Sequence, residues 1–195
     1  MKNLRAGLIV FISLTVLTGA VYPLLVYALG QGLFPGQANG SLLRKEGRVI
    51  GSSLIGQDFK SPEYFWPRPS AGDYTTMPGS ASNLGPTSAD LRKRIEDRQK
   101  LLAPFFTGAV PPELLLASAS GLDPHISPDA ARAQVNHVAQ ARGLAEPERK
   151  ALAALVEKSI EPATAGFMGQ PRVNVLRLNL ALDNLDGSPR PGGKP

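Results

Sequence analysis

Two serines, an aspartate and a histidine lie close together in the segment SASGLDPHISPDAA. Ser118, Ser120, Asp123 and His125 are the residue types of a serine-nucleophile site, in which the three groups align through two hydrogen bonds. Residues so near in sequence rarely reach that geometry, and no G-x-S-x-G elbow accompanies them. Because Asp-Pro favours a turn and Ser127 is a good helix cap, we expect a polar turn and a capped helix, with no catalytic residue.

Metal and phosphate ligands are also sparse. The chain has no cysteine and two histidines, His125 and His137, whose spacing is not that of a zinc site, so we predict no metal site. The loop at Ser118, Ser120 and Gly121 offers hydroxyls and a glycine for contact with a nucleotide. It lacks the G-x-x-x-x-G-K-[ST] pattern and its phosphate-binding lysine.

Tyr64, Phe65 and Trp66, followed closely by Arg68, form an aromatic cluster. Aromatic residues and arginine are enriched at the centres of protein interfaces, so the cluster could be a docking surface. Alternatively, the rings hold an irregular loop against its own domain. The sequence leaves both interpretations open.

A long segment near the N-terminus, residues 6–30, carries no formal charge. At about 1.5 Å per residue, a helix of this length crosses a hydrocarbon core of about 30 Å. We predict a retained membrane helix, because the alternative, a signal peptide cut after Gly30, usually has an apolar region of only about 7–15 residues. Lys2 and Arg5 precede the segment and the next charge is Arg44, so the N-terminus should be cytoplasmic and the following domain outside.

Several small or polar residues interrupt the apolar segment. Thr15 and Gly19 share a helix face, Tyr22 lies nearby, and Pro23 removes a backbone hydrogen bond. Small residues let membrane helices approach closely, so we expect this helix to pack on other membrane helices. It has no carboxylate, amine or imidazole that could line an ion path.

The rest of the chain predicts short strands and amphipathic helices. We expect a hairpin with Gly47 in its turn, a helix capped by Thr87 or Ser88, and a helix starting at Ser127-Pro128-Asp129 and ending at Gly143. A further helix should run from Pro147 to about Ile160. The alternating segment VNVLRLNLALD, from Val173, reads as a half-buried strand in which Asn174 needs a polar partner.

The predicted fold is a single N-terminal transmembrane α-helix plus an α+β extracytoplasmic domain. The net charge is +5, and its basic run around residues 92–100 is interrupted by acidic residues, which favours a solvated helix face over nucleic-acid binding. The predicted parts are a cytoplasmic N-terminus (1–5), the transmembrane helix (6–30), a linker (31–41), the soluble α+β domain (42–185) and a flexible tail (186–195).

Six ordered segments together resemble one family. They are GSSLIGQDF, YFWPRPSAGDY, SNLGPT, SGLDPHISPDAA, QVNHVA and PRVNVLRLNLALD, preceded by TGAVYPL in the apolar segment. The chain is similar in these segments to KdpC, the C subunit of Kdp-type potassium-transporting ATPases, over nearly its whole length. The shared motifs also contain the residues that become interface candidates: Tyr64, Phe65, Trp66, Arg68, Asn83, Asp123 and His125.

The resemblance implies a non-catalytic subunit of a complex in the bacterial inner (cell) membrane that imports potassium at high affinity. Its implied partners are a channel-like A subunit, a P-type B subunit that hydrolyses ATP through a phospho-aspartate, a very small F subunit, and membrane lipid. The resemblance also implies a catalytic-chaperone role, in which the serine-rich loop helps the B subunit bind ATP through a ternary complex. No stably bound cofactor is expected.

Two departures from the family pattern bear on the nucleotide role. The usual loop reads A-S-G-S-G, whereas Ala119 stands here for the central glycine and restricts the backbone. His137 stands where the family often has arginine, which removes a permanent charge. The predicted topology also separates the loop from cytoplasmic ATP. The alternatives are a membrane-tethered binding module without an ATPase partner and an anchored hydrolase, for which we see no nucleophile–base pair.

Overall fold

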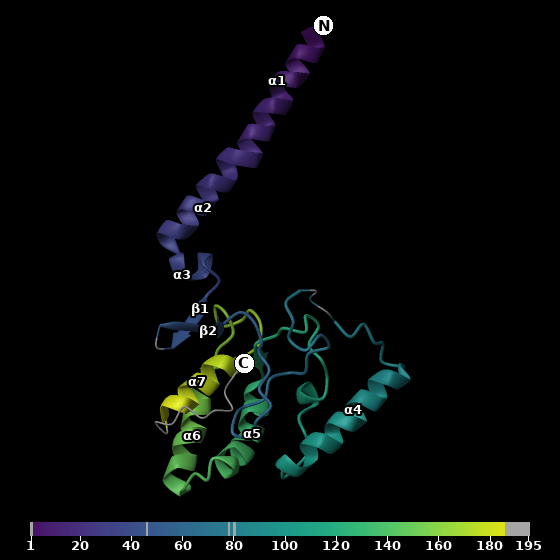
Figure 1. Cartoon of the computed structure of the whole chain (residues 1–195), viewed down its shortest axis with the longest axis vertical. Coiled ribbons are helices and arrows are strands. Elements are labelled where there is room, and N and C mark those ends of the chain that lie inside the picture. Colours follow the sequence, from purple (N-terminus) through teal and green to yellow (C-terminus); the bar gives the residue numbers. More distant parts are fainter. Residues whose placement is uncertain (1, 46, 78, 80, 186–195) are drawn as a thin grey trace. The chain divides into compact units, whose positions relative to one another are not determined.

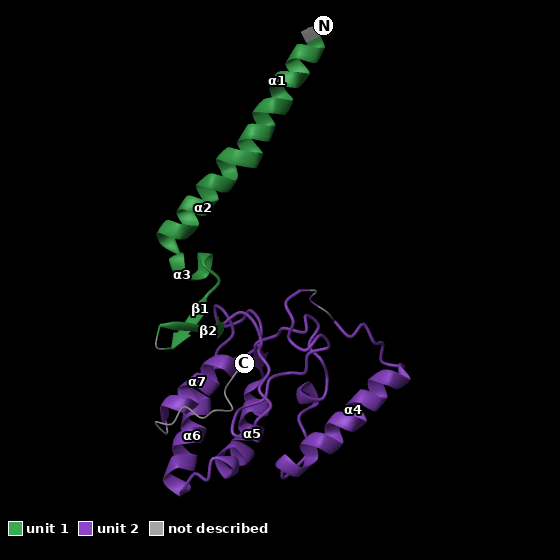
Figure 2. Ribbon diagram, viewed as in Figure 1, with its two compact units in different colours: residues 1–52 green, residues 53–195 purple. Residues whose placement is uncertain are grey.

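The structure, a computed structural model, describes residues 2–45, 47–77, 79 and 81–185 (Figure 1). It divides into two compact units, residues 1–52 and 53–195 (Figure 2). The predicted tail at 186–195 lies outside the described residues.

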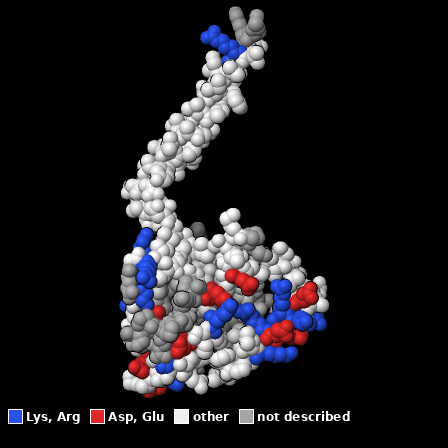
Figure 3. Space-filling model, in the orientation of Figure 1, with Lys and Arg blue, Asp and Glu red and all other residues white. Residues whose placement is uncertain are grey.

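The first unit begins with a long helix. It comprises α1 (Lys2–Val16), a π-helical turn (Leu17–Val21) and α2 (Tyr22–Leu33). From Asn3 to Leu33 its mean hydropathy reaches 2.2 and its most apolar stretch is entirely exposed, so it is long and apolar enough to cross a membrane. Figure 3 shows this helix free of charged side chains beyond its N-terminal end. The predicted helix is therefore confirmed, and it extends past Gly30.

The π-helical turn lies just before Pro23. The Tyr22 amide donates to the Leu17 carbonyl, five residues back, where a regular α-helix would use the residue four back. A proline lacks the amide that would continue the ladder, and a wider turn beside it is one way to absorb that loss. The hydroxyls of Thr15 and Thr18 donate to carbonyls one turn earlier, those of Phe11 and Leu14.

A short helix and a hairpin complete the first unit. Helix α3 (Pro35–Ala38) lies within the segment predicted as a linker. Strands β1 (Leu42–Lys45) and β2 (Arg48–Ser52) pair antiparallel, as predicted. Gly47 makes the turn with a φ of 78°, a conformation that glycine adopts without steric cost.

In its described residues, the second unit combines a small sheet with four α-helices. The antiparallel sheet has the order β3-β5-β4, formed by His125–Ile126, Arg172–Asn174 and Ile160–Glu161. The helices are α4 (Ala89–Leu102), α5 (Pro128–Ala141), α6 (Glu146–Lys158) and α7 (Val175–Leu185). Single 3-10 turns occupy Ala103–Phe105 and Pro112–Leu114. Helices α5, α6 and α7 pack side by side, while α4 lies apart from them (Figure 1).

Three predicted helices are confirmed, two of them with their predicted serine caps. The amide of Leu91 donates to the Ser88 hydroxyl at the start of α4. The amide of Ala130 donates to the Ser127 hydroxyl at the start of α5, and Gly143 follows that helix with a φ of 65°. Helix α6 covers nearly the predicted range. The mixture of helix and sheet is thus as the sequence indicates.

The predicted long strand from Val173 is wrong beyond Asn174. Only Arg172–Asn174 is a strand, and the leucine-rich remainder forms α7. Its buried positions, Val175, Leu178 and Leu182, also fit a helical spacing, and leucine is a strong helix former. Asn174 starts the helix because its Oδ1 accepts from the Arg177 amide, at 3.1 Å. Its Nδ2 donates to the Ser53 carbonyl at 2.8 Å, which supplies the polar partner the sequence required.

Candidate functional site

The serine-rich loop is a tight turn held to the domain. Ser118 is buried and its amide donates to the Pro69 carbonyl at 3.0 Å. The Gly121 amide donates to the Ser118 carbonyl at 3.2 Å, and the Leu122 amide to the Ser120 hydroxyl at 3.1 Å. These bonds occupy three backbone amides that a phosphate-binding loop would direct at its ligand. The loop therefore has less to offer a nucleotide than its composition indicates.

Asp123 links this loop to the segment between β2 and α4, called the irregular segment below, which contains Arg68. Its Oδ2 lies 3.0 Å from Arg68 Nη1, and its Oδ1 accepts from the His125 amide at 3.0 Å. The His125 side chain, with Nδ1 3.6 Å from Oδ1, and Arg68 hold the pKa of Asp123 below its ordinary value. The three side chains are about 30% exposed, so they remain accessible as an interface candidate.

The serine, aspartate and histidine side chains of this segment do not assemble into a nucleophilic site, as the sequence led us to expect. Ser118 is buried, and the Ser120 hydroxyl is used by the Leu122 amide. Within the described part of the chain, neither serine side chain hydrogen-bonds to His125. The same part contains no cluster of three His, Cys, Asp or Glu side chains that could hold a metal ion.

The aromatic cluster is buried in its own domain. Tyr64 and Phe65 are at most 1% exposed, and Trp66 is 8% exposed. Phe65 exchanges two hydrogen bonds of 2.9 Å with the side-chain amide of Asn179. Trp66 does the same with Gln134, at 2.7 and 3.2 Å. This burial favours the interpretation in which the rings hold the loop to its domain; contact with another subunit stays a prediction.

A buried charge pair lies beside Tyr64. Arg142 Nη2 contacts Asp183 Oδ1 at 3.1 Å, and both side chains are nearly inaccessible. The Tyr64 hydroxyl donates to the same carboxylate at 3.0 Å, and burial together with this bond raises the pKa of Tyr64 to about 12. Arg142 Nε donates to the Glu63 carbonyl at 2.7 Å. The sequence analysis did not predict this network, nor the paired hydrogen bonds that Asn179 and Gln134 make to the backbone of Phe65 and Trp66. Polar residues on otherwise apolar helix faces were the available signal.

His137 packs among aromatic rings. Its ring stacks on Trp66 with centroids 4.3 Å apart, and Phe105 and Phe106 lie within about 6 Å. Burial lowers the pKa of His137 to about 4, so the ring is neutral near pH 7.

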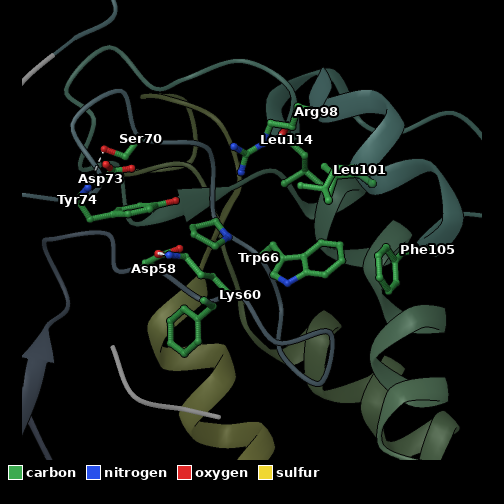
Figure 4. Close-up of a pocket in the computed structure, with 13 residues that line it drawn as sticks. Asp58, Lys60, Trp66, Ser70, Asp73, Tyr74, Arg98, Leu101, Phe105 and Leu114 are labelled. Carbon is green, nitrogen blue, oxygen red and sulfur yellow. Dashed lines mark hydrogen bonds and ion pairs between the residues drawn. The ribbon is translucent and has the colours of Figure 1, made fainter. Parts of the chain in front are cut away.

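A cavity of about 430 Å³ lies between α4 and the irregular segment (Figure 4). Trp66, Leu101 and Phe105 provide an apolar side, and Tyr74 and Arg98 a polar one. The Arg98 Nε donates to the Leu114 carbonyl at 2.9 Å, and burial lowers the pKa of Arg98. The cavity is lined by two acidic and two basic residues, whose formal charges cancel: Asp58, Asp73, Lys60 and Arg98. The cavity has room for a small group but shows no preference for charge.

The remaining predicted residues are dispersed. Asn83 lies in the irregular segment before α4 with a φ of 51°, and no described contact joins it to Asp123 or His125. Thr15, Gly19, Tyr22 and Pro23 lie on the exposed N-terminal helix, where contact with other membrane helices stays a prediction.

Comparison with known proteins gives one consistent result. The family model described as "KdpC: K+-transporting ATPase, c chain" matches residues 4–184. A potassium-transporting ATPase KdpC subunit from Geotalea uraniireducens is 48% identical over 190 residues, covering 95% of this chain and 99% of that one. The corresponding subunit from Methylibium petroleiphilum is 52% identical over 186 residues, covering 92% and 96%. The one from Cereibacter sphaeroides is 47% identical over 183 residues, covering 94% and 97%.

Proposed function

This chain belongs to the KdpC family of potassium-transporting ATPase subunits, and we propose that it is a non-catalytic subunit of a complex that imports potassium. The observation that carries the proposal is the family match, which covers residues 4–184 and so nearly all of the candidate membrane helix and of the described domain. The partners would be a potassium-conducting A subunit, an ATP-hydrolysing P-type B subunit and a small F subunit. The buried Ser118 and the occupied Ser120 hydroxyl support a role without catalysis by this chain.

The second part of the proposal concerns orientation in the bacterial inner membrane. Arg5 lies at one end of the apolar helix, and no charge follows until Arg44. Positive charges flanking a span favour the cytoplasmic side, so residues 31–195 would lie outside. From there the domain would brace the outer face of the potassium-conducting subunit, while Thr15 and Gly19 would pack on its membrane helices.

The third part concerns ATP. In the proposed orientation the loop at Ser118–Gly121 would not meet cytoplasmic ATP, and the amides of Ser118, Gly121 and Leu122 are already used. An effect of this chain on ATP binding by the B subunit would instead be a coupling free energy passed through the membrane helices. A ternary complex with ATP at Ser118, Ser120 and Gly121 is the alternative route. No cofactor would be held stably.

Topology can be tested with single cysteines, because the chain contains none. Ala153→Cys places a thiol on the exposed side of α6, and Asn3→Cys places one at the start of the span. A membrane-impermeant maleimide applied to intact cells should label the first variant at full length and the second only after lysis. The reverse pattern would place the domain in the cytoplasm and favour direct contact with ATP. A labelled product shortened by the length of the span would mean a cleaved signal peptide.

The subunit role can be tested in the complex. A chain ending after Ser41 keeps the span and lacks the outer domain. We expect it to lower either recovery of the complex or the potassium affinity of its ATPase activity. A fully assembled complex with unchanged activation by potassium would contradict the bracing role. Purification of the full-length chain in detergent as a lone monomer would favour a tethered binding module.

A further inference from the structure

A short hairpin connects β4 and β5. Thr164 and Met168 exchange two backbone hydrogen bonds of 2.9 Å, and the Gly166 amide donates to the Ala163 carbonyl at 3.0 Å. Below the tip, β4 and β5 continue the pairing with Ile160 opposite Val173. The tip, residues 163–169, is therefore held in one shape by its own backbone.

This tip presents two large apolar side chains to solvent. Phe167 is 80% exposed and Met168 is 60% exposed. Phe167 is the most exposed phenylalanine that the structure describes in residues 53–185. The run from Pro162 to Pro171 carries no charged residue. An exposed phenylalanine in such a run gains nothing from its own domain and would gain from burial elsewhere.

The backbone conformation at the tip is also typical of a binding site. Ala165 has a φ of 54° and Gly166 a φ of 82°. The left-handed region suits glycine, but in Ala165 the Cβ crowds the following carbonyl. Such strain is found at binding and catalytic sites, where the surrounding structure sustains it. Here it lies next to the exposed Phe167 and Met168.

The base of the hairpin is polar. Glu161 pairs with Arg172 at 3.3 Å and with Arg177 at 3.2 Å, and all three side chains are partly exposed. An apolar patch with charged residues at its border is the usual arrangement of a protein–protein interface. A rigid anchor also loses little conformational entropy when it enters a pocket, which favours tight association.

We propose that the 163–169 tip inserts Phe167 and Met168 into an uncharged apolar pocket on another subunit of the potassium-transporting ATPase. This inference rests on the subunit role proposed above. A protein pocket suits the tip better than a lipid surface does. Segments that bind lipid surfaces combine a broad apolar face with lysine and arginine, whereas this tip has two side chains and no basic residue.

The occupant can be identified by photocrosslinking in the assembled complex in native membranes. A benzophenone amino acid replaces Phe167 in one variant and Met77, which is 88% exposed, in the control. We expect position 167 to form an adduct with another subunit at a yield several times that of position 77. Adducts with lipid alone would overturn the proposal in favour of a membrane contact. A protein adduct no stronger than the control, or no adduct, would also overturn it.

Affinity provides an independent measure. Phe167→Ala should weaken retention of this chain in the detergent-solubilised complex by about 10- to 100-fold, as loss of an interface anchor does. Phe167→Leu, which keeps an apolar side chain, should restore most of it. Because the ring is exposed, the thermal unfolding of either variant should match that of the unaltered chain. Unchanged retention of Phe167→Ala would reject the anchor.

The two proposals fail in different ways. If the unaltered chain does not co-purify with the other subunits, the subunit role itself is rejected. If the unaltered chain co-purifies and the tip variants are retained in the complex just as well, the subunit role stands and the tip proposal is rejected.

Discussion

Asn179 on α7 and Phe65 in the irregular segment exchange two hydrogen bonds, each 2.9 Å long, between residues 114 positions apart in the chain. The asparagine side chain donates to the Phe65 carbonyl and accepts from its amide, as a neighbouring strand would. Gln134 on α5 likewise accepts from the Trp66 amide and donates to the Trp66 carbonyl. Two helix side chains thus satisfy the backbone of a buried segment that cannot join the sheet.

This relationship predicts a large effect of removing the asparagine amide. Asn179→Leu would leave the amide and carbonyl of Phe65 buried without partners, so we expect a loss of about 2–4 kcal/mol in the free energy of unfolding. Asn184→Leu makes the same change at an exposed position of α7 and should shift stability by less than about 0.5 kcal/mol. Urea titration of both variants measures the difference. Equal stability of the two would show that the clamp contributes little.

The pair formed by Arg142 and Asp183 predicts a second contrast. Arg142→Met should cost about 3–5 kcal/mol, because it leaves the Asp183 carboxylate buried without its cation. Arg132→Met breaks the 2.6 Å pair with Glu157, but those side chains are about half exposed, so solvent screens the pair and we expect a much smaller loss. Chemical denaturation of both variants compares the two environments. Similar losses would mean that burial does not decide the strength of these pairs.

The helices that begin at Ser88 and Ser127 could be predicted because their signals are local. A capping serine, a proline or acidic residue after it, and apolar spacing all lie within one or two turns. The hairpin at Gly47 and the membrane helix are equally local. The segment after Asn174 misled the prediction because alternating leucines fit a strand over a short window. Its helix depends on a cap at Asn174 and on burial of Val175 and Leu182, which only the tertiary fold reveals.

The candidate site shows the same limit. The motif segments could be recognised, but composition alone did not show that Tyr64 and Phe65 would be buried or that Ser118 would be inaccessible. The backbone groups of Phe65, Trp66 and Glu63 are held by residues far along the chain: Asn179 on α7, Gln134 on α5 and Arg142 just after α5. Contacts of that range follow from the fold and have no local signature in sequence.

His137 predicts that the domain loses stability in mild acid. Burial among Trp66 and the neighbouring rings lowers the pKa of His137 to about 4, below the ordinary value near 6.5. The unfolded chain therefore takes up the proton first as the pH falls. The contribution of neutral His137 to the free energy of unfolding is therefore complete above about pH 6.5. It declines as the pH falls from about 6.5 to 4 and stays at its minimum below about pH 4. A shift of this size corresponds to about 3 kcal/mol.

The test is denaturant unfolding at several pH values between 4 and 7, with His137→Phe as the matched variant. Phenylalanine keeps a ring against Trp66 and has no proton to gain. We expect the difference in stability between the two chains to change across this window and to be constant above it. A pH profile that is parallel for the two chains would show that another group causes the acid sensitivity.

Gly56 predicts the effect of a single added methyl group. Its amide donates to the Leu122 carbonyl at 2.8 Å, and a Cβ at this position would lie 2.7 Å from the Asp123 carbonyl oxygen. Because the backbone at Gly56 or at Asp123 must then move, Gly56→Ala should destabilise the domain by about 1–3 kcal/mol. It should also displace Asp123 from Arg68 and His125. Gly108→Ala is the control, since a Cβ there meets nothing within 4 Å. Thermal unfolding of the two variants, together with the NMR signals of His125, measures both effects. A Gly56→Ala variant as stable as Gly108→Ala, with unchanged His125 signals, would show that the close approach is not required.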